Sequence, residues 1–290
     1  MQKNHSTKHA LPLLQTALAA ACAALWLAAA APRPALADHE VVDGIKWVYE
    51  TDDGKASLGA MAVPRSTEGT VTVPARLGGC PVEEIGDYAF YDCARITRIV
   101  LPKGVKRLGE HAFQNCTSLE SVELPDSVDD MDGYYIFMDC TALKSVTLPR
   151  KVAAVGAYAF FGCSALETVE WPAALEEIGL SAFSHCRSLK EIHFPRKLDR
   201  IRPYAFCECD SLRTLVFPES LSVIQESAFY SCRALRELVL PKNLEGIGDN
   251  AFLNTGLERV TVLGNPEGDR TDWGRIWGLP KDCELSVPGQ

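Results

Sequence analysis

Eight copies of one short sequence fill the middle of this chain. Each copy reads approximately I-G-x-x-A-F-x-x-C-x-x-L-x-x-V-x-L-P. The repeat Phe recurs every 23 residues with one step of 24, at Phe90, Phe113, Phe137, Phe160, Phe183, Phe206, Phe229 and Phe252. A fixed period in this range is typical of a solenoid, in which each repeat packs only on its neighbours. Most apolar residues are therefore scaffold, and function must use the positions that vary between copies.

Each copy contains the pattern of one short strand. In the second copy, apolar Val122 and Leu124 alternate with polar residues, which predicts a strand with one buried face. Pro125 ends this strand because Pro cannot donate a ladder hydrogen bond. The Ala-Phe-x-x-Cys segment is too short for a full helix and predicts one helical or 3₁₀ turn. The Gly after the repeat Ile suits a bend with positive φ, and one extra residue in the third copy predicts a small bulge there.

The repeat resembles the leucine-rich repeat family, and specifically its BspA-like (Treponema pallidum-type) subclass. The copy from Ile178 to Pro195 shows the pattern well, and the match runs from about Pro81 to Val262. The resemblance implies a β-rich α/β solenoid: a right-handed superhelix with a parallel β-sheet on one face and short helical or 3₁₀ turns on the other. It also implies a bacterial surface or secreted protein that binds other macromolecules, in adhesion or co-aggregation, with no catalytic residues.

The first 37 residues have the features of a secretory signal peptide. Lys3 and Lys8 precede an Ala/Leu-rich stretch, and Ala35-Leu36-Ala37 offers a small-x-small cleavage site before Asp38. An uncleaved membrane anchor is the alternative, since the apolar stretch is long. Lipidation at Cys22 is a weaker alternative, because the apolar residues continue beyond Cys22.

The remaining chain divides into a repeat array and two caps. Residues 38–80 are expected to form an N-terminal cap with a degenerate first repeat, residues 81–263 the eight repeats, and residues 264–290 a C-terminal cap. Solenoid ends must cover their exposed core. We therefore interpret Trp273 and Trp277 as capping residues, with ligand binding as the alternative.

The charge of the chain argues against nucleic acid and anionic lipid as partners. The formal net charge is −9, and removal of residues 1–37 takes away three cations and no acid, which leaves −12. An acidic protein is a poor candidate for binding nucleic acid or anionic lipid. We expect a secreted, periplasmic or cell-surface protein with no membrane span after cleavage, and the sequence leaves anchoring and oligomeric state open.

Ten cysteines follow the predicted leader, and seven of them form a ladder. These seven each lie three residues after the repeat Phe: Cys93, Cys116, Cys140, Cys163, Cys186, Cys209 and Cys232. Neighbouring rungs would lie about 5 Å apart, so disulfides between adjacent rungs are possible. We favour buried thiols that act as small apolar groups with a weak donor.

Two stripes of variable residues are candidate binding surfaces. The first follows the exposed side of the predicted strands and includes Glu123, Glu170, Glu191, His193, Val216 and Val239. The second is aromatic, lies before the repeat Ala, and includes Tyr88, Tyr135, Tyr158 and Tyr204. A sheet face is a common solenoid binding surface, and Tyr is favoured at interfaces. The alternatives are a solvated strand face and Tyr rings that stack on each other, which we favour for the second stripe.

Signals for catalysis are poor. Cys186 follows His185 but is a ladder rung, and Cys207-Glu208-Cys209 lacks the second ligand pair of a zinc site. We find no phosphate-binding loop or serine nucleophile motif, and we expect no cofactor or metal. The sequence therefore predicts an exported, non-catalytic protein that binds a protein or glycan. An inert envelope spacer, or an accessory subunit of another exported protein, is the alternative.

Overall fold

The computed structural model describes residues 37–264 and 276–287. Residues Asp38–Gln290 form one compact unit. The predicted leader before Ala37 and the predicted capping residue Trp273 lie outside the described residues. Within the two described ranges, no helix is long and apolar enough to cross a membrane.

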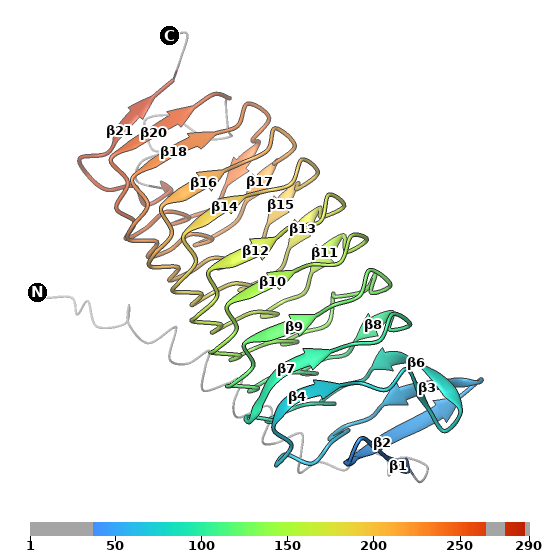
Figure 1. The fold of residues 1–290 in the computed structure, drawn as a ribbon. Helices are drawn as coiled ribbons and strands as arrows, with labels where there is room; N and C mark the ends of the chain where they lie inside the picture. Colours follow the sequence, from blue (N-terminus) through green and yellow to red (C-terminus); the bar gives the residue numbers. More distant parts are fainter. Residues whose placement is uncertain (1–36, 265–275, 288–290) are drawn as a thin grey trace, which may run out of the picture. The chain divides into compact units, whose positions relative to one another are not determined.

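The predicted strand around the repeat Val forms a parallel row, which Figure 1 shows as arrows stacked along the solenoid. Equivalent residues of neighbouring repeats lie opposite each other, as Ile192 does with Leu215. The row divides into the ladders β4-β7-β9, β10-β12, β14-β16 and β18-β20-β21. Its strands are β4 (Gly69–Thr72), β7 (Ile96–Val100), β9 (Ser121–Glu123), β10 (Ser145–Thr147), β12 (Thr168–Glu170), β14 (Glu191–His193), β16 (Thr214–Val216), β18 (Glu237–Leu240), β20 (Arg259–Val262) and β21 (Glu284–Ser286).

A second row of parallel strands, which the sequence analysis did not predict, ends at the repeat Ile. Five two-residue strands form one ladder, β11-β13-β15-β17-β19. At the irregular third repeat only an isolated bridge, Arg107 with Asp130, continues the row. The strands are β6 (Cys80–Ile85), β8 (Arg107–Leu108), β11 (Ala154–Val155), β13 (Glu177–Ile178), β15 (Arg200–Ile201), β17 (Val223–Ile224) and β19 (Gly246–Ile247).

The Ala-Phe-x-x-Cys segment forms hydrogen-bonded turns, and residues 37–264 contain no helix. The expectation of a helical or 3₁₀ face is therefore wrong. Alternate amides donate to the next repeat, as Phe90 N does to the Ala112 oxygen at 2.7 Å. The amides between them close single turns, such as Tyr91 N to the Tyr88 oxygen at 3.2 Å. Because every second N–H bonds to the neighbouring repeat, the i to i−4 ladder of a helix cannot form.

Positive φ occurs at two positions of each turn, and neither is the Gly after the repeat Ile. The residues before the repeat Ala and before the repeat Cys adopt it, for example Tyr158 (58°) and His185 (63°). The expectation of positive φ at the Gly is therefore wrong. That Gly permits close backbone approach instead, since a Cβ at Gly179 would lie 2.6 Å from the Val155 carbonyl oxygen.

The eight repeat phenylalanines form one continuous stack through the core. Consecutive rings from Phe90 to Phe252 have centroids 4.8–5.6 Å apart and interplanar angles of 3–10°. All eight side chains are fully buried. These distances lie within the range of favourable offset stacking, so each ring joins its repeat to both neighbours.

Each end of this stack adjoins a cap that contains a buried tryptophan. Trp47 on β2 (Ile45–Asp52) meets Phe90 edge-on at 6.3 Å, and β2 pairs with β1 (Asp38–Val42) and β3 (Lys55–Leu58). β5 (Arg76–Leu77) completes this cap. At the other end, Phe252 N donates to the Trp277 carbonyl oxygen at 2.8 Å, and Trp277 is buried. The caps therefore continue the repeat's own contacts, as solenoid ends require.

Candidate binding surfaces

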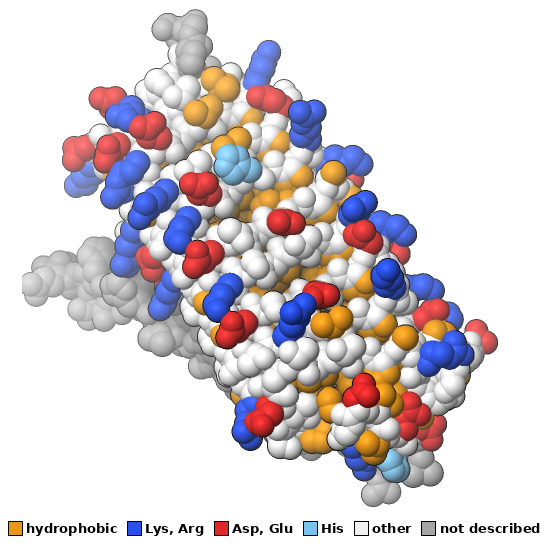
Figure 2. Space-filling view, in the orientation of Figure 1, with side chains coloured by type: hydrophobic (Ala, Val, Ile, Leu, Met, Phe, Trp, Pro, Cys, Tyr) orange, Lys and Arg blue, Asp and Glu red, His pale blue; other side chains and the backbone are white. Residues whose placement is uncertain are grey.

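The predicted strand-face residues lie exposed along the first row of strands. Their positions alternate with buried residues, as in β14, where Glu191 and His193 flank buried Ile192. The same alternation exposes Glu123 on β9, Glu170 on β12, Val216 on β16 and Val239 on β18. We call these outward positions of the first row the strand face, which is turned toward the viewer in Figures 1 and 2.

Polar residues in the N-terminal part of the strand face bond to each other. Glu123 forms an ion pair with Arg98 one repeat away, and Glu170 accepts a hydrogen bond from Thr147 Oγ1 at 3.0 Å. Solvent-exposed pairs of this kind contribute little to stability. They also occupy the groups that a partner would otherwise contact.

The strand face around β14 and β16 differs, although Glu237 beyond it pairs with Arg259. Glu191 and His193 form no ion pair or side-chain hydrogen bond within the described residues. Val216, directly opposite His193 in the ladder, is 47 % exposed. Val239, its equivalent in the next repeat, is 52 % exposed. The structure thus brings four of the predicted site residues into one patch, which we call the valine patch (Glu191, His193, Val216 and Val239), while Glu123 and Glu170 lie outside it.

The aromatic stripe is a stack of rings. Tyr88 stacks on His111 at 4.5 Å, His111 on Tyr135 at 4.7 Å, and Tyr135 on Tyr158 at 4.9 Å. The rings are half-buried, so they present edges rather than faces to solvent. Burial, with carboxylates nearby, raises the pKa of the Tyr88 phenol. The favoured alternative of mutual stacking therefore describes these four positions.

Tyr204 is separated from the four-ring stack. Buried Ser181 stands at the intervening position, and the Tyr204 hydroxyl lies 3.3 Å from Glu226. Burial, with the Glu226 carboxylate nearby, raises the Tyr204 pKa. The Tyr stripe is thus interrupted after Tyr158.

Sequence analysis missed two exposed residues beside the stack. Tyr134 is 51 % exposed and meets Tyr135 edge-on. Met61 is also 51 % exposed, and its backbone N–H donates to the Tyr88 carbonyl oxygen at 3.1 Å. The extra residue of the third repeat was the available signal for Tyr134. No repeat pattern reaches Met61, which lies in the cap.

The cysteine ladder consists of free, buried thiols. From Cys116 onward, each thiol donates to the carbonyl oxygen of the Phe in the preceding repeat, for example Cys186 Sγ to the Phe160 oxygen at 3.3 Å. Burial raises the pKa of Cys93 to about 11 and that of Cys186 still further. A buried neutral thiol is a poor nucleophile, so these contacts are structural.

His185 and Cys186 do not form a catalytic pair. Cys186 is fully buried and bonds to the core, whereas His185 packs edge-on against Phe161 at 4.9 Å. His185 Nδ1 lies 3.2 Å from a Glu208 carboxylate oxygen, yet burial dominates and lowers the pKa of the imidazole. Burial also raises the pKa of Cys207 to about 12. Across residues 37–264 and 276–287, no cluster of three or more potential metal ligands occurs.

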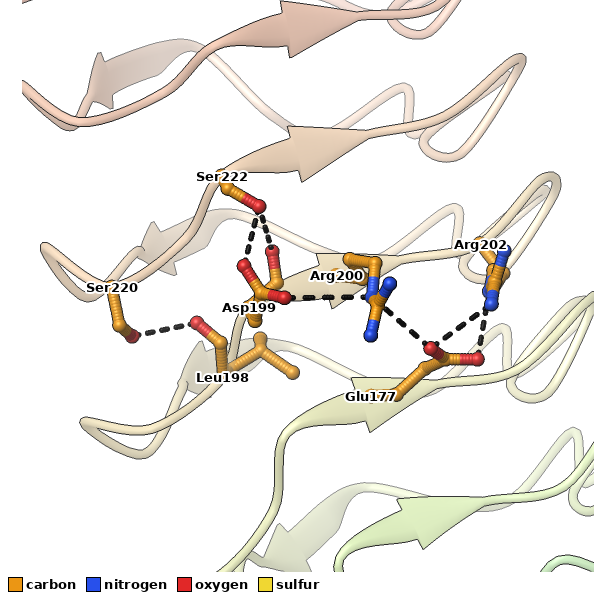
Figure 3. A network of polar contacts seen from close by, with 7 residues as sticks. All are labelled: Glu177, Leu198, Asp199, Arg200, Arg202, Ser220 and Ser222. Atoms are coloured by element: carbon orange, nitrogen blue, oxygen red, sulfur yellow. Dashed lines mark hydrogen bonds and ion pairs between the residues drawn. The ribbon is translucent and has the colours of Figure 1, made fainter.

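The second row of strands carries a charge network of its own, shown in Figure 3. Glu177 accepts two hydrogen bonds from Arg202, from Nε at 2.7 Å and from Nη2 at 3.1 Å, and it also lies 3.3 Å from Arg200 Nε. Asp199 in turn contacts Arg200 at 3.4 Å and accepts from the Ser222 hydroxyl. Because these charges neutralise one another across repeats, this face offers few free groups to a partner.

Comparison with known proteins agrees with the observed repeats. Residues 83–209 and 154–267 match the BspA type leucine rich repeat region, with six copies. A leucine-rich repeat protein from Bacteroides ovatus has a similar structure, with 28 % identity and a TM-score of 0.53, covering 86 % of this chain and 76 % of that one.

The T. pallidum leucine-rich repeat protein is another similar structure, with 23 % identity and a TM-score of 0.45 over 88 % of this chain and 98 % of that one. No curated protein matches the sequence significantly. The matched repeat region spans more than half of the residues, from 83 to 267. The chain therefore belongs to the BspA-type leucine-rich repeat family.

Proposed function

We propose that this chain is an exported, non-catalytic protein that binds a macromolecule, a protein or a glycan, through its strand face. One observation carries the proposal: the valine patch exposes two large aliphatic side chains next to polar groups that have no partner in the described residues. On the strand face from β7 to β12, by contrast, Glu123 pairs with Arg98 and Glu170 with Thr147. Unpaired groups around exposed apolar residues are typical of an interaction site.

The family and the sequence support the proposal independently of the surface geometry. BspA-type repeats are generally interaction repeats of surface proteins, and the Ala/Leu-rich first 37 residues are those expected of an exported chain. The ladder thiols are buried, and Cys186 bonds to the core and does not pair with His185, which favours binding over catalysis. An adhesive role is one form that such binding can take.

The valine patch suggests where affinity would arise. A partner that covers Val216 and Val239 would gain roughly 25 cal/mol for each Å² of apolar surface removed from water. Glu191 and His193 at the border would set orientation through hydrogen bonds. Since a few central anchors dominate most interfaces, the two valines are the expected anchors and the outlying Glu123 and Glu170 are expected to matter less.

An inert spacer is the second candidate, because much of the described surface is neutralised internally. Ion pairs join adjacent repeats at several positions, including Lys106–Glu83 and Lys190–Glu167. A spacer needs stiffness and solubility but no free anchor. A binding protein and a spacer therefore differ in one measurable respect: whether the valine patch has a partner that binds saturably.

Binding of residues 38–290 to immobilised extracellular matrix proteins and mucin, measured by surface plasmon resonance, tests the proposal. The variant replaces Glu191→Gln, His193→Ser, Val216→Thr and Val239→Thr together. A matched control on the same face replaces Val100→Thr, Ser121→Thr and Ser145→Thr. We expect saturable binding that the first variant loses and the control retains.

Other results would count against the proposal in distinguishable ways. Saturable binding that both variants retain would exclude the strand face and favour the aromatic stripe, which a Tyr88→Ser and Tyr158→Ser variant would then test. The absence of saturable binding to every probe would favour the spacer. Thermal denaturation of each variant separates loss of binding from loss of fold.

A further inference from the structure

One loop edge of the solenoid carries an unusual distribution of charge. Each repeat Pro begins a turn. The residue three positions after the Pro donates its N–H to the Pro carbonyl oxygen, as Leu198 does to Pro195 at 3.1 Å. The two residues between them form the tip of the turn. We call the row of tips the proline edge: Lys103–Gly104, Asp126–Ser127, Arg150–Lys151, Ala173–Ala174, Arg196–Lys197, Glu219–Ser220 and Lys242–Asn243.

The tips are held firmly in line. Ser220 Oγ donates to the Leu198 carbonyl oxygen of the preceding repeat at 2.6 Å, which Figure 3 shows. Ser127 Oγ makes the same bond to Val105 at 2.6 Å. Asn243 Nδ2 donates to the Glu219 carbonyl oxygen at 2.9 Å. Side chains on these tips therefore project from a rigid, regularly spaced base.

Most cations of the proline edge have no acidic partner. Arg150 pairs with Asp126 at 3.3 Å. The others are exposed and form no ion pair within the described residues: Lys103, Lys151, Arg196, Lys197 and Lys242. The edge thus holds six cations and two carboxylates in a chain whose net charge is −9. In Figure 2, Lys and Arg side chains follow the right-hand border of the solenoid, where these turns lie in Figure 1.

The opposite loop edge shows that such charges need not be free. The residue after the repeat Leu is charged in each repeat there, and opposite charges of adjacent repeats pair, as in Lys144–Glu120 at 2.7 Å and Lys190–Glu167 at 2.9 Å. We call this row the ion-pair edge: Glu120, Lys144, Glu167, Lys190, Arg213, Arg236 and Glu258. On this edge, Lys144, Lys190 and Arg236 are therefore each neutralised by a carboxylate one repeat away, whereas Arg213 forms no ion pair within the described residues.

Cations occupy every second tip of the proline edge. Lys103, Arg150–Lys151, Arg196–Lys197 and Lys242 alternate with the tips of Asp126, Ala173–Ala174 and Glu219. Neighbouring parallel strands lie about 5 Å apart, so the basic tips recur at roughly 10 Å along the solenoid. A ligand that matches them is linear and carries its anionic groups at about the same interval.

We propose that the proline edge binds a linear acidic polysaccharide that carries one carboxylate per disaccharide. The length of a disaccharide unit is of the same order as two strand spacings, so one carboxylate would meet each basic tip. The cations sit on fixed turns, which lowers the entropic cost of binding. This inference uses a surface other than the valine patch, and rests on the proposed export only for the place where the polymer is met.

The neighbours of the tips fit a sugar chain. Half-buried aromatic residues follow the adjacent strands β12 and β16, with Trp171 before one intervening tip and Phe217 before another. Their exposed apolar surface can pack against the C–H faces of sugar rings. On the other side, Glu176 and Asp199 directly precede strands β13 and β15, and these acids would keep the polymer on the strand-face side.

Two other polyanions fit less well. Duplex DNA carries one charge per about 1.7 Å of axis, far denser than the basic tips, and the acidic remainder of the protein would repel it. An anionic membrane requires apolar residues among the cations for stable attachment. The exposed large hydrophobic residues of the described chain lie elsewhere, at Val41, Met61, Tyr134, Val216, Val239, Leu263 and Leu285.

Biolayer interferometry with immobilised hyaluronan fragments tests the proposal on residues 38–290, the compact unit that holds both caps. The proline-edge variant carries Lys151→Gln, Arg196→Gln, Lys197→Gln and Lys242→Gln. The matched control removes four cations from the ion-pair edge: Lys144→Gln, Lys190→Gln, Arg213→Gln and Arg236→Gln. Neutral dextran, duplex DNA and vesicles rich in phosphatidylserine serve as comparison ligands.

We expect saturable, salt-sensitive binding to hyaluronan that the proline-edge variant weakens at least about tenfold. The control variant, with the same change in net charge, should stay within about twofold. Equal losses of hyaluronan affinity in both variants would mean that net charge alone explains the binding, and would contradict a site on the proline edge. DNA or vesicles bound as tightly as hyaluronan would overturn the choice of ligand. Hyaluronan binding that survives loss of the valine patch would show the two sites to be separate.

A charge-conserving variant tests the spacing. Arg196→Ser and Lys197→Ser together with Ala173→Arg and Ala174→Lys keep the net charge but move both cations from a basic tip to an intervening tip. Because the register with a disaccharide repeat is then broken, hyaluronan should bind several-fold more weakly. Unchanged affinity would contradict the spacing argument, even if the proline-edge variant loses binding.

Discussion

The two loop edges of this solenoid are built by the same repeat and carry similar charged residues, yet they present charge in opposite ways. On the ion-pair edge, Lys144 and Lys190 each meet a carboxylate of the preceding repeat. On the proline edge, Lys197 and Lys242 stand beside tips whose carboxylate is absent or forms no pair with them within the described residues. The difference lies in which opposite charges meet across the stack and requires no change of fold.

This comparison suggests how a repeat protein acquires a site without altering its core. Each repeat places equivalent side chains about one strand spacing apart. Opposite charges at the same position of adjacent repeats are therefore neighbours and can neutralise each other, as Glu167 and Lys190 do. On the proline edge, only Arg150 pairs with a carboxylate one repeat away, and the other five cations remain available within the described residues. The balance of cations over paired carboxylates thus distinguishes a solvated edge from a candidate binding edge.

The largest expected effect comes from breaking the core that both edges share. Phe183 is fully buried and stacks between Phe160 at 5.0 Å and Phe206 at 5.4 Å. Phe183→Ala should lower the free energy of unfolding by about 3–5 kcal/mol, because a large cavity remains in a stack with no alternative partner. Urea denaturation followed by circular dichroism measures the change.

A surface valine provides the control for this prediction. Val216 is 47 % exposed on the same scaffold, and Val216→Ala should change the unfolding free energy by less than about 0.5 kcal/mol. A Phe183→Ala loss as small as this would mean that the stack is not the main link between repeats. The register that separates the two edges would then need another explanation.

The next effect concerns pH and should be independent of both edges. Burial lowers the pKa of His111 and of His185 below the usual value of 6.5. The unfolded chain then binds more protons than the folded one as pH falls through 6.5, so stability decreases toward acid. We expect the unfolding free energy at pH 5.5 to be lower than at pH 7.5.

Replacements found at equivalent positions of other repeats test this origin. His111→Tyr matches Tyr88 and Tyr135, and His185→Asn matches Asn115, which also has positive φ. The double variant should lose much of the decrease in stability between pH 7.5 and 5.5, measured by thermal denaturation. A decrease that persists in this variant and disappears in the proline-edge variant would instead place the titrating electrostatics on the surface.

The sequence predicted the parts of the fold that depend on side chains repeating at a fixed position. The Phe stack and the row of parallel strands follow from apolar residues such as Phe183 and Ile192. The second row was missed because two-residue strands such as Glu177–Ile178 are too short to show alternation. The helical turn was wrong because backbone bonds between repeats, such as Phe90 to Ala112, leave no pattern in one copy.

The candidate surfaces were predictable to a lesser degree. Exposure of Val216 follows from strand alternation, but the pairing of Glu123 with Arg98 depends on side-chain reach across repeats. For the aromatic stripe, the sequence left two alternatives open, binding and mutual stacking. The stacking of His111 between two tyrosines corresponds to the second. The proline edge had a readable signal in the two residues after each repeat Pro, and only the absence of partners for Lys197 distinguishes it from a solvated edge.

The smallest expected effect compares one pair from each edge directly. Lys190 Nζ lies 2.9 Å from Glu167, and both side chains are more than half exposed. A double-mutant cycle with Lys190→Ala and Glu167→Ala should give a coupling energy of about 0.2–1 kcal/mol, reduced by salt.

Lys197 and Glu219, on adjacent tips of the proline edge, form no ion pair within the described residues, so the same cycle there should give a coupling near zero. Equal coupling in the two cycles would mean that the tip charges neutralise each other in solution after all. Urea titrations of both cycles at low and high salt measure the two coupling energies. The contrast between the edges, and with it the availability of the proline edge to a polyanion, depends on the difference between them.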